Sequence, residues 1–100
     1  MAVYLLAQLR FTQRDAYDRY QARFRDVFRR FDGRLLAADD APVALEGEWD
    51  RDKVVLMAFP DEASARRFVE SPEYQEISRD RHAGADTLAL LVRGIPAPDA

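Results

Sequence analysis

The sequence predicts an α+β fold with the element order β-α-β-β-α-β and one additional helix before the last strand. Three observations indicate this order. Apolar residues recur at steps of three and four between Tyr17 and Phe31, which is the period of a helix. Residues 53–59 and 87–95 are short runs rich in apolar residues, as is typical of strands. Pro60 ends the first of these runs because proline cannot donate a hydrogen bond to a strand ladder.

The first two elements are a strand over residues 3–10 and a long helix over about residues 13–32. Thr12 is a suitable N-cap for this helix, with Asp15 in its first turn. Gly33 is expected to end the helix as a left-handed C-cap residue. The apolar stripe of the helix consists of Tyr17, Tyr20, Phe24, Val27, Phe28 and Phe31.

Turn and capping residues separate the remaining elements. A strand over 34–38 is broken by Asp39-Asp40-Ala41-Pro42 and is expected to resume as extended chain over 43–49. Asp61 caps a helix. Ser71 ends that helix and caps the next one, with Pro72 at the favoured first position. The other expected elements are strands over 53–59 and 87–95 and a helix over 72–83, closed by Gly84.

The 100 residues are enough for one domain, and no internal repeat divides them. We assign residues 1–95 to this domain. Residues 96–100, which begin with Pro96-Ala97-Pro98, are expected to form a flexible C-terminal tail. Strands separated by helices around one central hairpin correspond to the ferredoxin-like split βαβ plan, so the expected fold class is ferredoxin-like α+β.

The expected sheet is apolar on both of its faces. In the strand over 53–59 apolar side chains occupy both alternating sets, and the first and last strands are nearly as apolar. Leaving these side chains in water would cost more than a small domain can lose, at about 25 cal/mol per Å² of apolar surface. The chain has no further element to cover the second face. We therefore expect the same face of a second copy to cover it, which makes the protein a homodimer.

Composition excludes several classes of site. Without cysteine there are no disulfides and no thiolate nucleophiles. His82 is the only histidine, and no glycine-rich phosphate loop or dinucleotide motif is present, so we predict no metal and no cofactor. The net charge is −3, and the arginines of residues 10–34 are interleaved with aspartates. This pattern favours a solvated helix face over a nucleic-acid surface.

The apolar N-terminal stretch is too short to be a membrane span. Arg10 interrupts it well before spanning length, and it lacks the basic segment and the cleavage site of a signal peptide. We therefore expect no membrane association and a cytoplasmic location.

Several short segments, in this order and at these spacings, resemble one bacterial family. They are Glu46-Gly47-Glu48-Trp49, residues 54–60, Ser71-Pro72-Glu73-Tyr74-Gln75, Arg81 and the final apolar strand. On these segments the chain resembles the family catalogued as domain of unknown function 1330 over nearly its whole length. The resemblance implies a dimeric α+β barrel, and it supplies neither a settled reaction nor a list of catalytic residues.

Five residues are candidates for a site. Arg81 shares a helix face with Tyr74, and an arginine drawn inward needs an anionic partner, either Glu46 or a ligand carboxylate or phosphate. Arg81, Tyr74 and Trp49 are expected to bind the substrate, the two aromatic residues as pocket walls. His82 and Glu46 are the expected catalytic residues, because Arg81 can lower the pKa of the adjacent His82. The alternative is structural, with Trp49 over a barrel rim and His82 solvated.

Two functions from different classes remain open. In the first, the protein is a cofactor-independent enzyme acting on a small anionic molecule, similar in fold to antibiotic-biosynthesis monooxygenases and muconolactone isomerases. In the second, it is a non-catalytic homodimer that binds a small anionic metabolite. Shared fold is a weak warrant for function. A sealed pocket with Arg81 paired to Glu46 argues against both functions, whereas an open pocket with an unpaired Arg81 favours binding.

Overall fold

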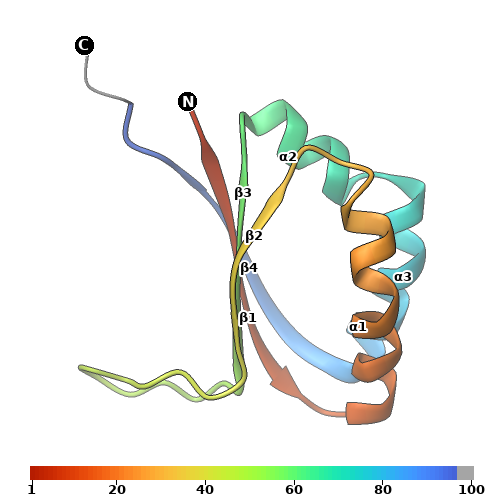
Figure 1. Cartoon of the computed structure of the whole chain (residues 1–100). Coiled ribbons are helices and arrows are strands. Elements are labelled where there is room, and N and C mark those ends of the chain that lie inside the picture. Colours follow the sequence, from red (N-terminus) through yellow and green to blue (C-terminus); the bar gives the residue numbers. More distant parts are fainter. Residues whose placement is uncertain (97–100) are drawn as a thin grey trace.

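The computed structural model describes residues 1–96, so the predicted tail lies outside the described residues from residue 97 onward. Its elements are β1 (Val3–Phe11), α1 (Arg14–Phe28), β2 (Arg34–Asp39), β3 (Lys53–Phe59), α2 (Glu62–Val69), α3 (Pro72–Gly84) and β4 (Ala85–Arg93) (Figure 1). The predicted order, including the additional helix before the last strand, is confirmed. Among these residues, no helix has both the length and the apolar character needed to cross a membrane.

The four strands form one antiparallel sheet in the order β2-β3-β1-β4. All three helices cover the same face of this sheet (Figure 1). The predicted ferredoxin-like α+β fold is therefore confirmed. The strand register places side chains in rows across the sheet. Leu5 of β1 lies between its partners Met57 of β3 and Leu91 of β4. In the same way Leu9 lies between its strand partners Lys53 and Thr87.

The start of α1 is held by tertiary contacts and not by the predicted cap. Gln13 is the N-cap residue, and its side chain makes no capping hydrogen bond. The backbone N–H groups of Thr12 and Gln13 instead donate to the carbonyl oxygen of Gly84, at 2.9 and 3.1 Å. A Cβ atom on Gly84 would collide with the backbone nitrogen of Tyr17. The predicted Thr12 cap is wrong because the close approach of α3 satisfies these donors.

The end of α1 also differs from the prediction, because the helix stops at Phe28. Arg29 is the C-cap residue with right-handed angles, φ −64° and ψ −12°. Gly47 is the only described residue with a positive φ, so the predicted left-handed role of Gly33 is wrong. A Cβ atom on Gly33 would lie 2.7 Å from ring atoms of both Phe28 and Phe59. Glycine is needed there so that the backbone can pass over two buried rings.

Residues 40–52 form a loop where the sequence predicted that the second strand would resume. β2 ends at Asp39, whose Oδ1 accepts a hydrogen bond from the N–H of Ala41 at 2.9 Å. The loop then projects from the sheet on the side away from the helices (Figure 1). Val43 and Leu45 are 81% and 95% exposed, and no described strand pairs with this segment. The predicted extended strand over 43–49 is therefore wrong.

The caps predicted for α2 and α3 are confirmed. The Asp61 carboxylate accepts a hydrogen bond from the N–H of Ser64 at 2.7 Å, which fixes the start of α2. The Ser71 hydroxyl accepts one from the N–H of Tyr74 at 3.1 Å and donates one to the carbonyl oxygen of Phe68 at 2.8 Å. One residue thus ends α2 and begins α3. This connection turns Tyr74 into the space between the helices and the sheet.

An aromatic cluster fills the core at one end of the helix layer. Phe68 of α2 is fully buried, and five other rings surround it. They are Phe24, Phe28, Phe31, Phe59 and Tyr74, with ring centroids 4.4 to 6.2 Å from that of Phe68. Phe59 pairs with Val3, so the cluster lies at the end of the sheet where β1 begins.

The opposite face of the sheet, called the open face here, carries apolar side chains that no described element covers. Leu88, Leu90 and Val92 of β4 are 44%, 48% and 44% exposed. The strand register adds Tyr4 and Leu6 of β1, and Leu56 of β3, to the same face. The expectation of a sheet that is apolar on both faces is confirmed by this arrangement.

Phe28→Ala is expected to lower the free energy of unfolding by about 3–5 kcal/mol, because it leaves a cavity among three packed rings. Urea unfolding followed by circular dichroism measures the loss. Arg30→Ala alters an exposed residue just beyond the helix and should change the same free energy by less than about 0.5 kcal/mol. A loss below about 1 kcal/mol for Phe28→Ala would contradict its place in the core.

Candidate functional site

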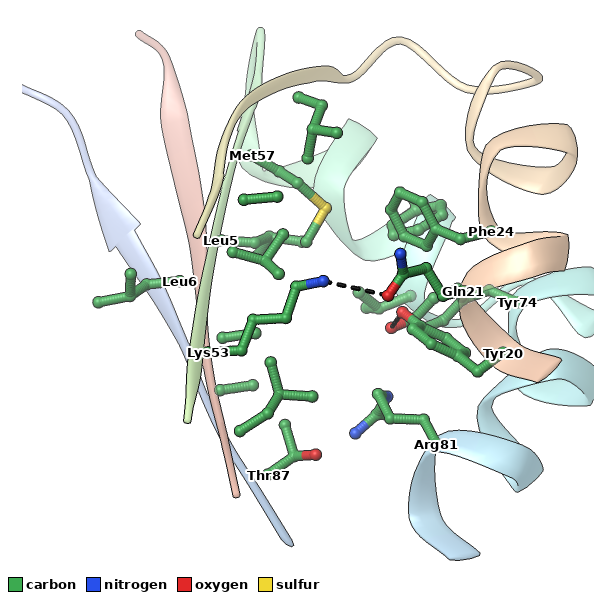
Figure 2. A pocket seen from close by; sticks show the side chains of 18 of the residues that line it. Leu5, Leu6, Tyr20, Gln21, Phe24, Lys53, Met57, Tyr74, Arg81 and Thr87 are labelled. Carbon is green, nitrogen blue, oxygen red and sulfur yellow. Dashed lines mark hydrogen bonds between the residues drawn. The ribbon is translucent and has the colours of Figure 1, made fainter. Parts of the chain in front are cut away.

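A cavity of about 420 Å³ lies between the helix layer and the sheet (Figure 2). All four strands and all three helices contribute to its lining. Most of the lining is apolar and includes Leu5, Ala7, Leu9, Phe24, Val55, Met57, Phe68 and Leu91. A concave site of this size, with apolar walls and few polar groups, is typical of small-molecule binding.

Lys53 is the most deeply buried cation of the cavity. It is the only lysine of the chain, and it is 5% exposed. Its Nζ donates to Oε1 of Gln21 at 3.1 Å and lies 3.2 Å from Oδ1 of Asp40, so both partners come from outside the sheet. Sequence reasoning missed Lys53. The signal was present, because Lys53 alternates with Val55, Met57 and Phe59 on the face that the helices cover.

Two phenol groups meet at the wall formed by the helices. The hydroxyls of Tyr20 and Tyr74 lie 2.9 Å apart and both side chains are buried. Burial, and after it the neighbouring Tyr74, raises the pKa of Tyr20 well above its ordinary value. Tyr20 is therefore neutral at physiological pH. Because two phenols share only one hydrogen bond here, one O–H group is left to donate to a ligand.

Arg81 and Thr87 face each other across one end of the cavity (Figure 2). The Arg81 side chain points from α3 toward the sheet, with its Cζ 5.9 Å from the ring centroid of Tyr20. Its Nε is buried without a hydrogen-bond partner, and so is Oγ1 of Thr87 on β4. Within residues 1–96, no carboxylate lies within ion-pair distance of Arg81. Unpartnered buried polar atoms of this kind are rare and require an explanation.

The structure brings together two of the five residues proposed from the sequence. Arg81 and Tyr74 both line the cavity, whereas Trp49, Glu46 and His82 are absent from its lining. The expected contact between Glu46 and Arg81 is not formed, because Glu46 is exposed on the loop that projects from the open face. His82 is exposed, and its pKa is lowered by partial desolvation and then by the charge of Arg81. The binding and catalytic roles of the five residues stay predictions.

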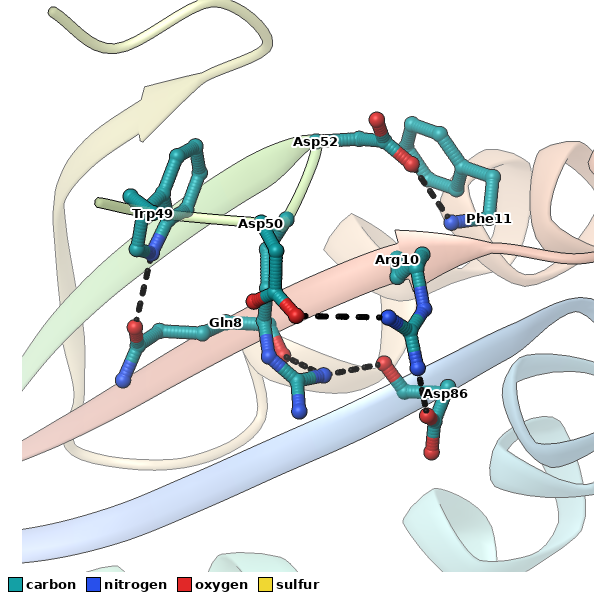
Figure 3. A network of polar contacts seen from close by, with 8 residues as sticks. Gln8, Arg10, Phe11, Trp49, Asp50, Asp52 and Asp86 are labelled. Carbon is teal, nitrogen blue, oxygen red and sulfur yellow. Dashed lines mark hydrogen bonds and ion pairs between the residues drawn. The ribbon is translucent and has the colours of Figure 1, made fainter. Parts of the chain in front are cut away.

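Trp49 lies on the open face, where a polar network anchors the end of the loop (Figure 3). Its indole Nε1 donates to Oε1 of Gln8 at 2.9 Å. Next to it, Arg10 pairs with Asp50 at 3.4 Å and with Asp86 at 2.8 Å. These contacts tie the loop to β1 and β4 and hold the indole against the sheet. The position of Trp49 therefore has a structural explanation that needs no pocket.

The chemistry available in the cavity is that of cations and neutral hydroxyl groups. Its lining includes Lys53, Arg81, Arg25 and Arg66, and among the described residues it includes no aspartate, glutamate or histidine. The part of the chain that the structure describes also contains no group of three or more acidic, histidine or cysteine side chains that could hold a metal ion. Such a cavity can bind an anion and can stabilise a developing oxyanion.

Residues 2–95 match the family described as "Domain of unknown function (DUF1330)". The chain belongs to this family. The resemblance noted in the sequence is thereby confirmed over nearly the whole chain. No curated protein matches the chain significantly.

Three solved structures illustrate how widely the fold is shared. A protein of unknown function from Rhodopseudomonas palustris has 20% identity and a TM-score of 0.78, with 96% of this chain and 84% of that chain covered. A protein described as a dimeric ferredoxin-like protein of unknown function from Jannaschia sp. CCS1 has 19% identity, a TM-score of 0.73, and coverage of 94% and 100%. SnoaB, a cofactor-independent oxygenase from Streptomyces nogalater, has 15% identity, a TM-score of 0.68, and coverage of 96% and 95%. At these identities the likeness shows the fold alone.

Tyr17→Phe is expected to make stability less sensitive to high pH. Burial, followed by the charge of Asp40, raises the pKa of Tyr17 to about 12, against about 10 in the unfolded chain. Because the folded pKa is the higher one, this contribution to stability is complete below about pH 10 and is lost as the pH rises through about 12. Urea unfolding across this interval should show a smaller loss for Tyr17→Phe than for the unmodified protein. Equal losses of unfolding free energy in the two proteins would show that the raised pKa of Tyr17 does not cause the loss.

Proposed function

We propose that the cavity between the helices and the sheet binds a small organic anion, and that Arg81 recognises its anionic group. The observation that carries this proposal is the Arg81 guanidinium, which enters an apolar cavity with a buried and unpartnered Nε. Eight other arginines form ion pairs within the described chain. Arg79, on the same helix as Arg81, is one of them. Arg81 differs from these residues in both its position and its lack of a partner.

The energetics support an anionic ligand. The Nε–H group of Arg81 is buried without a partner, and a buried donor that makes no hydrogen bond is unfavourable because the apolar surroundings do not replace its hydration. A carboxylate or an ionised enol or phenol that reaches Arg81 would form charge-assisted hydrogen bonds, which are about twice as strong as neutral ones. An anionic ligand also suits the remaining lining, because Arg25 is exposed at the cavity and its positive charge would attract an anion.

A cofactor-independent enzyme is the form of this function that the Tyr20–Tyr74 pair favours. The remaining phenol O–H group, together with Arg81, provides donors for an oxyanion that forms on a bound substrate. An isomerisation needs a base that moves a proton at the substrate, and both proposed bases, His82 and Glu46, lie outside the cavity lining. A monooxygenase-like reaction fits the lining better: dioxygen oxidises a substrate that binds already ionised, one oxygen atom enters the product, and the other leaves as water with electrons that the substrate supplies. The likeness in fold to a cofactor-independent oxygenase supports this class.

A non-catalytic metabolite-binding protein is the alternative, and the same lining favours it. Recognition of an anion by Arg81 does not require turnover, and the lining contains no aspartate, glutamate or histidine among the described residues that could act as a general base. The two functions are separated by whether a bound anion is consumed. The cytoplasmic location expected from the sequence stays a prediction.

We also infer that the protein works as a homodimer through its open face. Leu88, Leu90 and Val92 leave a broad apolar surface in water, which is unusual for a monomer. Two similar solved structures are described as dimeric ferredoxin-like proteins, which supports a second copy as the cover. An isologous contact of two open faces would bury the same residues of each copy.

Leu90→Asp is expected to convert the dimer to a monomer, because burial of an unpaired carboxylate between two apolar faces is costly. Light scattering at micromolar concentration measures the mass. Ala63→Asp, at an exposed position in the first turn of α2, introduces the same charge away from the open face and should leave the dimer intact. A monomeric unmodified protein would contradict the homodimer directly.

Arg81→Ala is expected to weaken binding of a small organic anion by about tenfold to a hundredfold, because it removes hydrogen bonds to a charged group. A thermal-shift screen with a library of metabolite anions finds the probe, and calorimetry then measures its affinity. Arg79→Ala is the matched control on the same helix, since Arg79 is exposed and paired with Glu76 at 3.6 Å.

Unchanged affinity in Arg81→Ala would sink the site assignment. If the probe is also consumed, the effect of His82→Ala separates the remaining roles. A loss of turnover with unchanged affinity would support the predicted catalytic role of His82. Unchanged turnover would leave His82 as a solvated residue.

A further inference from the structure

We infer that the ligand is an amphipathic anion whose charged head binds between Arg81 and Thr87 and whose apolar body lies over Ala7 and Ala89. This inference rests on the proposed function and specifies the class of ligand. It follows from the way polarity changes along the strands that form the floor of the cavity, from the row that contains Lys53 to the row that contains Met57.

The polar end of the cavity is the row Lys53, Leu9 and Thr87. Across the cavity from this row lie Arg81 and the Tyr20–Tyr74 pair, which come from the helices (Figure 2). Lys53 already has Gln21 and Asp40 as partners. Among the side-chain nitrogen and oxygen atoms of this lining, Arg81 Nε and Thr87 Oγ1 are buried and have no hydrogen-bond partner at all. The head of the ligand therefore belongs between these two residues, where it would satisfy both.

The middle of the floor is made of small side chains. Ala7 of β1 faces Val55 of β3 and Ala89 of β4. Ala89 is exposed although it lies on the face that the helices cover, because the cavity opens above it. Methyl groups offer no hydrogen bonds, so a hydroxylated body would lose its contacts with water here and gain nothing in return. A flat or narrow hydrocarbon body fits this part of the cavity.

The far end of the floor is the row Met57, Leu5 and Leu91, four residues along the strands from the polar row. At about 3.3 Å per residue this separates the two rows by about 13 Å, which limits the length of the apolar body. Phe24, Phe68 and Val69 close this end from the helix side. The anionic groups of sugar acids and inorganic anions fit the polar end of the cavity, but these molecules have no apolar body to fill the apolar part of the floor.

Four probes of stated chemistry test the inference: acetate, hexanoate, gluconate and inorganic phosphate. Hexanoate should bind more tightly than acetate by about fourfold for each methylene that is buried, which corresponds to about 0.8 kcal/mol per methylene. Gluconate has the six-carbon chain of hexanoate with hydroxyls on its body, and it should bind at least about a hundredfold more weakly than hexanoate. Calorimetry on the full chain measures all four affinities.

Two variants locate the parts of the ligand. Thr87→Val should lower the affinity for hexanoate by about tenfold, because it removes a hydrogen-bond donor to the carboxylate without changing the shape of the side chain. Ser78→Ala is its matched control, since Ser78 Oγ is also buried without a partner but lies outside the cavity lining. Ala89→Leu should abolish the preference for hexanoate over acetate by filling the floor. Ala83→Leu, at an exposed position of α3, should preserve it. Thermal melts verify that each variant is folded.

The outcomes separate this inference from the proposed function. If acetate, phosphate and gluconate bind as tightly as hexanoate and all are lost in Arg81→Ala, the cavity binds anions and the amphipathic class is wrong. If hexanoate is preferred but Thr87→Val and Ala89→Leu leave its affinity unchanged, the orientation is wrong. If none of the four probes binds at millimolar concentration, this inference is contradicted, whereas the proposed function fails only if no anion of the metabolite library binds in a way that depends on Arg81.

Discussion

The distance between the helix layer and the sheet is the constraint on which the rest of the structure depends. At one end large rings around Phe68 hold the two layers apart. At the other end the carbonyl oxygen of Gly84 accepts hydrogen bonds from the backbone N–H groups of Thr12 and Gln13, just before α1. The backbones of α1 and α3 therefore meet here without side chains between them. The sheet between these two ends carries small residues, Ala7 and Ala89. A layer fixed at both ends over a floor of small side chains leaves a cavity between them.

This arrangement also explains why charge enters the interior. The helices are amphipathic, and Arg81 lies on the same side of α3 as Tyr74, just before that helix ends. In an ordinary core such an arginine would extend to water, because its charge is costly to bury. Here the cavity between α3 and Thr87 admits the guanidinium (Figure 2). On the open face of the sheet, in contrast, the apolar side chains of Leu88 and Leu90 are exposed, and the polar contacts are confined to the anchor of the 40–52 loop.

The parts of the fold that depend on local chemistry could be predicted from the sequence. The helical stripe from Tyr17, the serine that ends one helix and caps the next, and the proline after β3 each act within a few residues. Residues whose role depends on distant partners could not be placed. Glu46 and Trp49 were assigned to the cavity, but a loop carries them to the other side of the sheet. The alternation of strand residues places Lys53 on the covered face, but its partners, Gln21 and Asp40, come from separate elements and could not be predicted.

The burial of Lys53 has a consequence for covalent labelling. It is the only lysine of the 100 residues, and the structure leaves 5% of it exposed. Acylating reagents that attack side-chain amines therefore find no accessible lysine on the folded protein. Their reaction with Lys53 requires that the cavity admit the reagent or that the chain unfold. Mass spectrometry of the acylated peptide would then report, from a single atom, how often the cavity is open and whether something already occupies it.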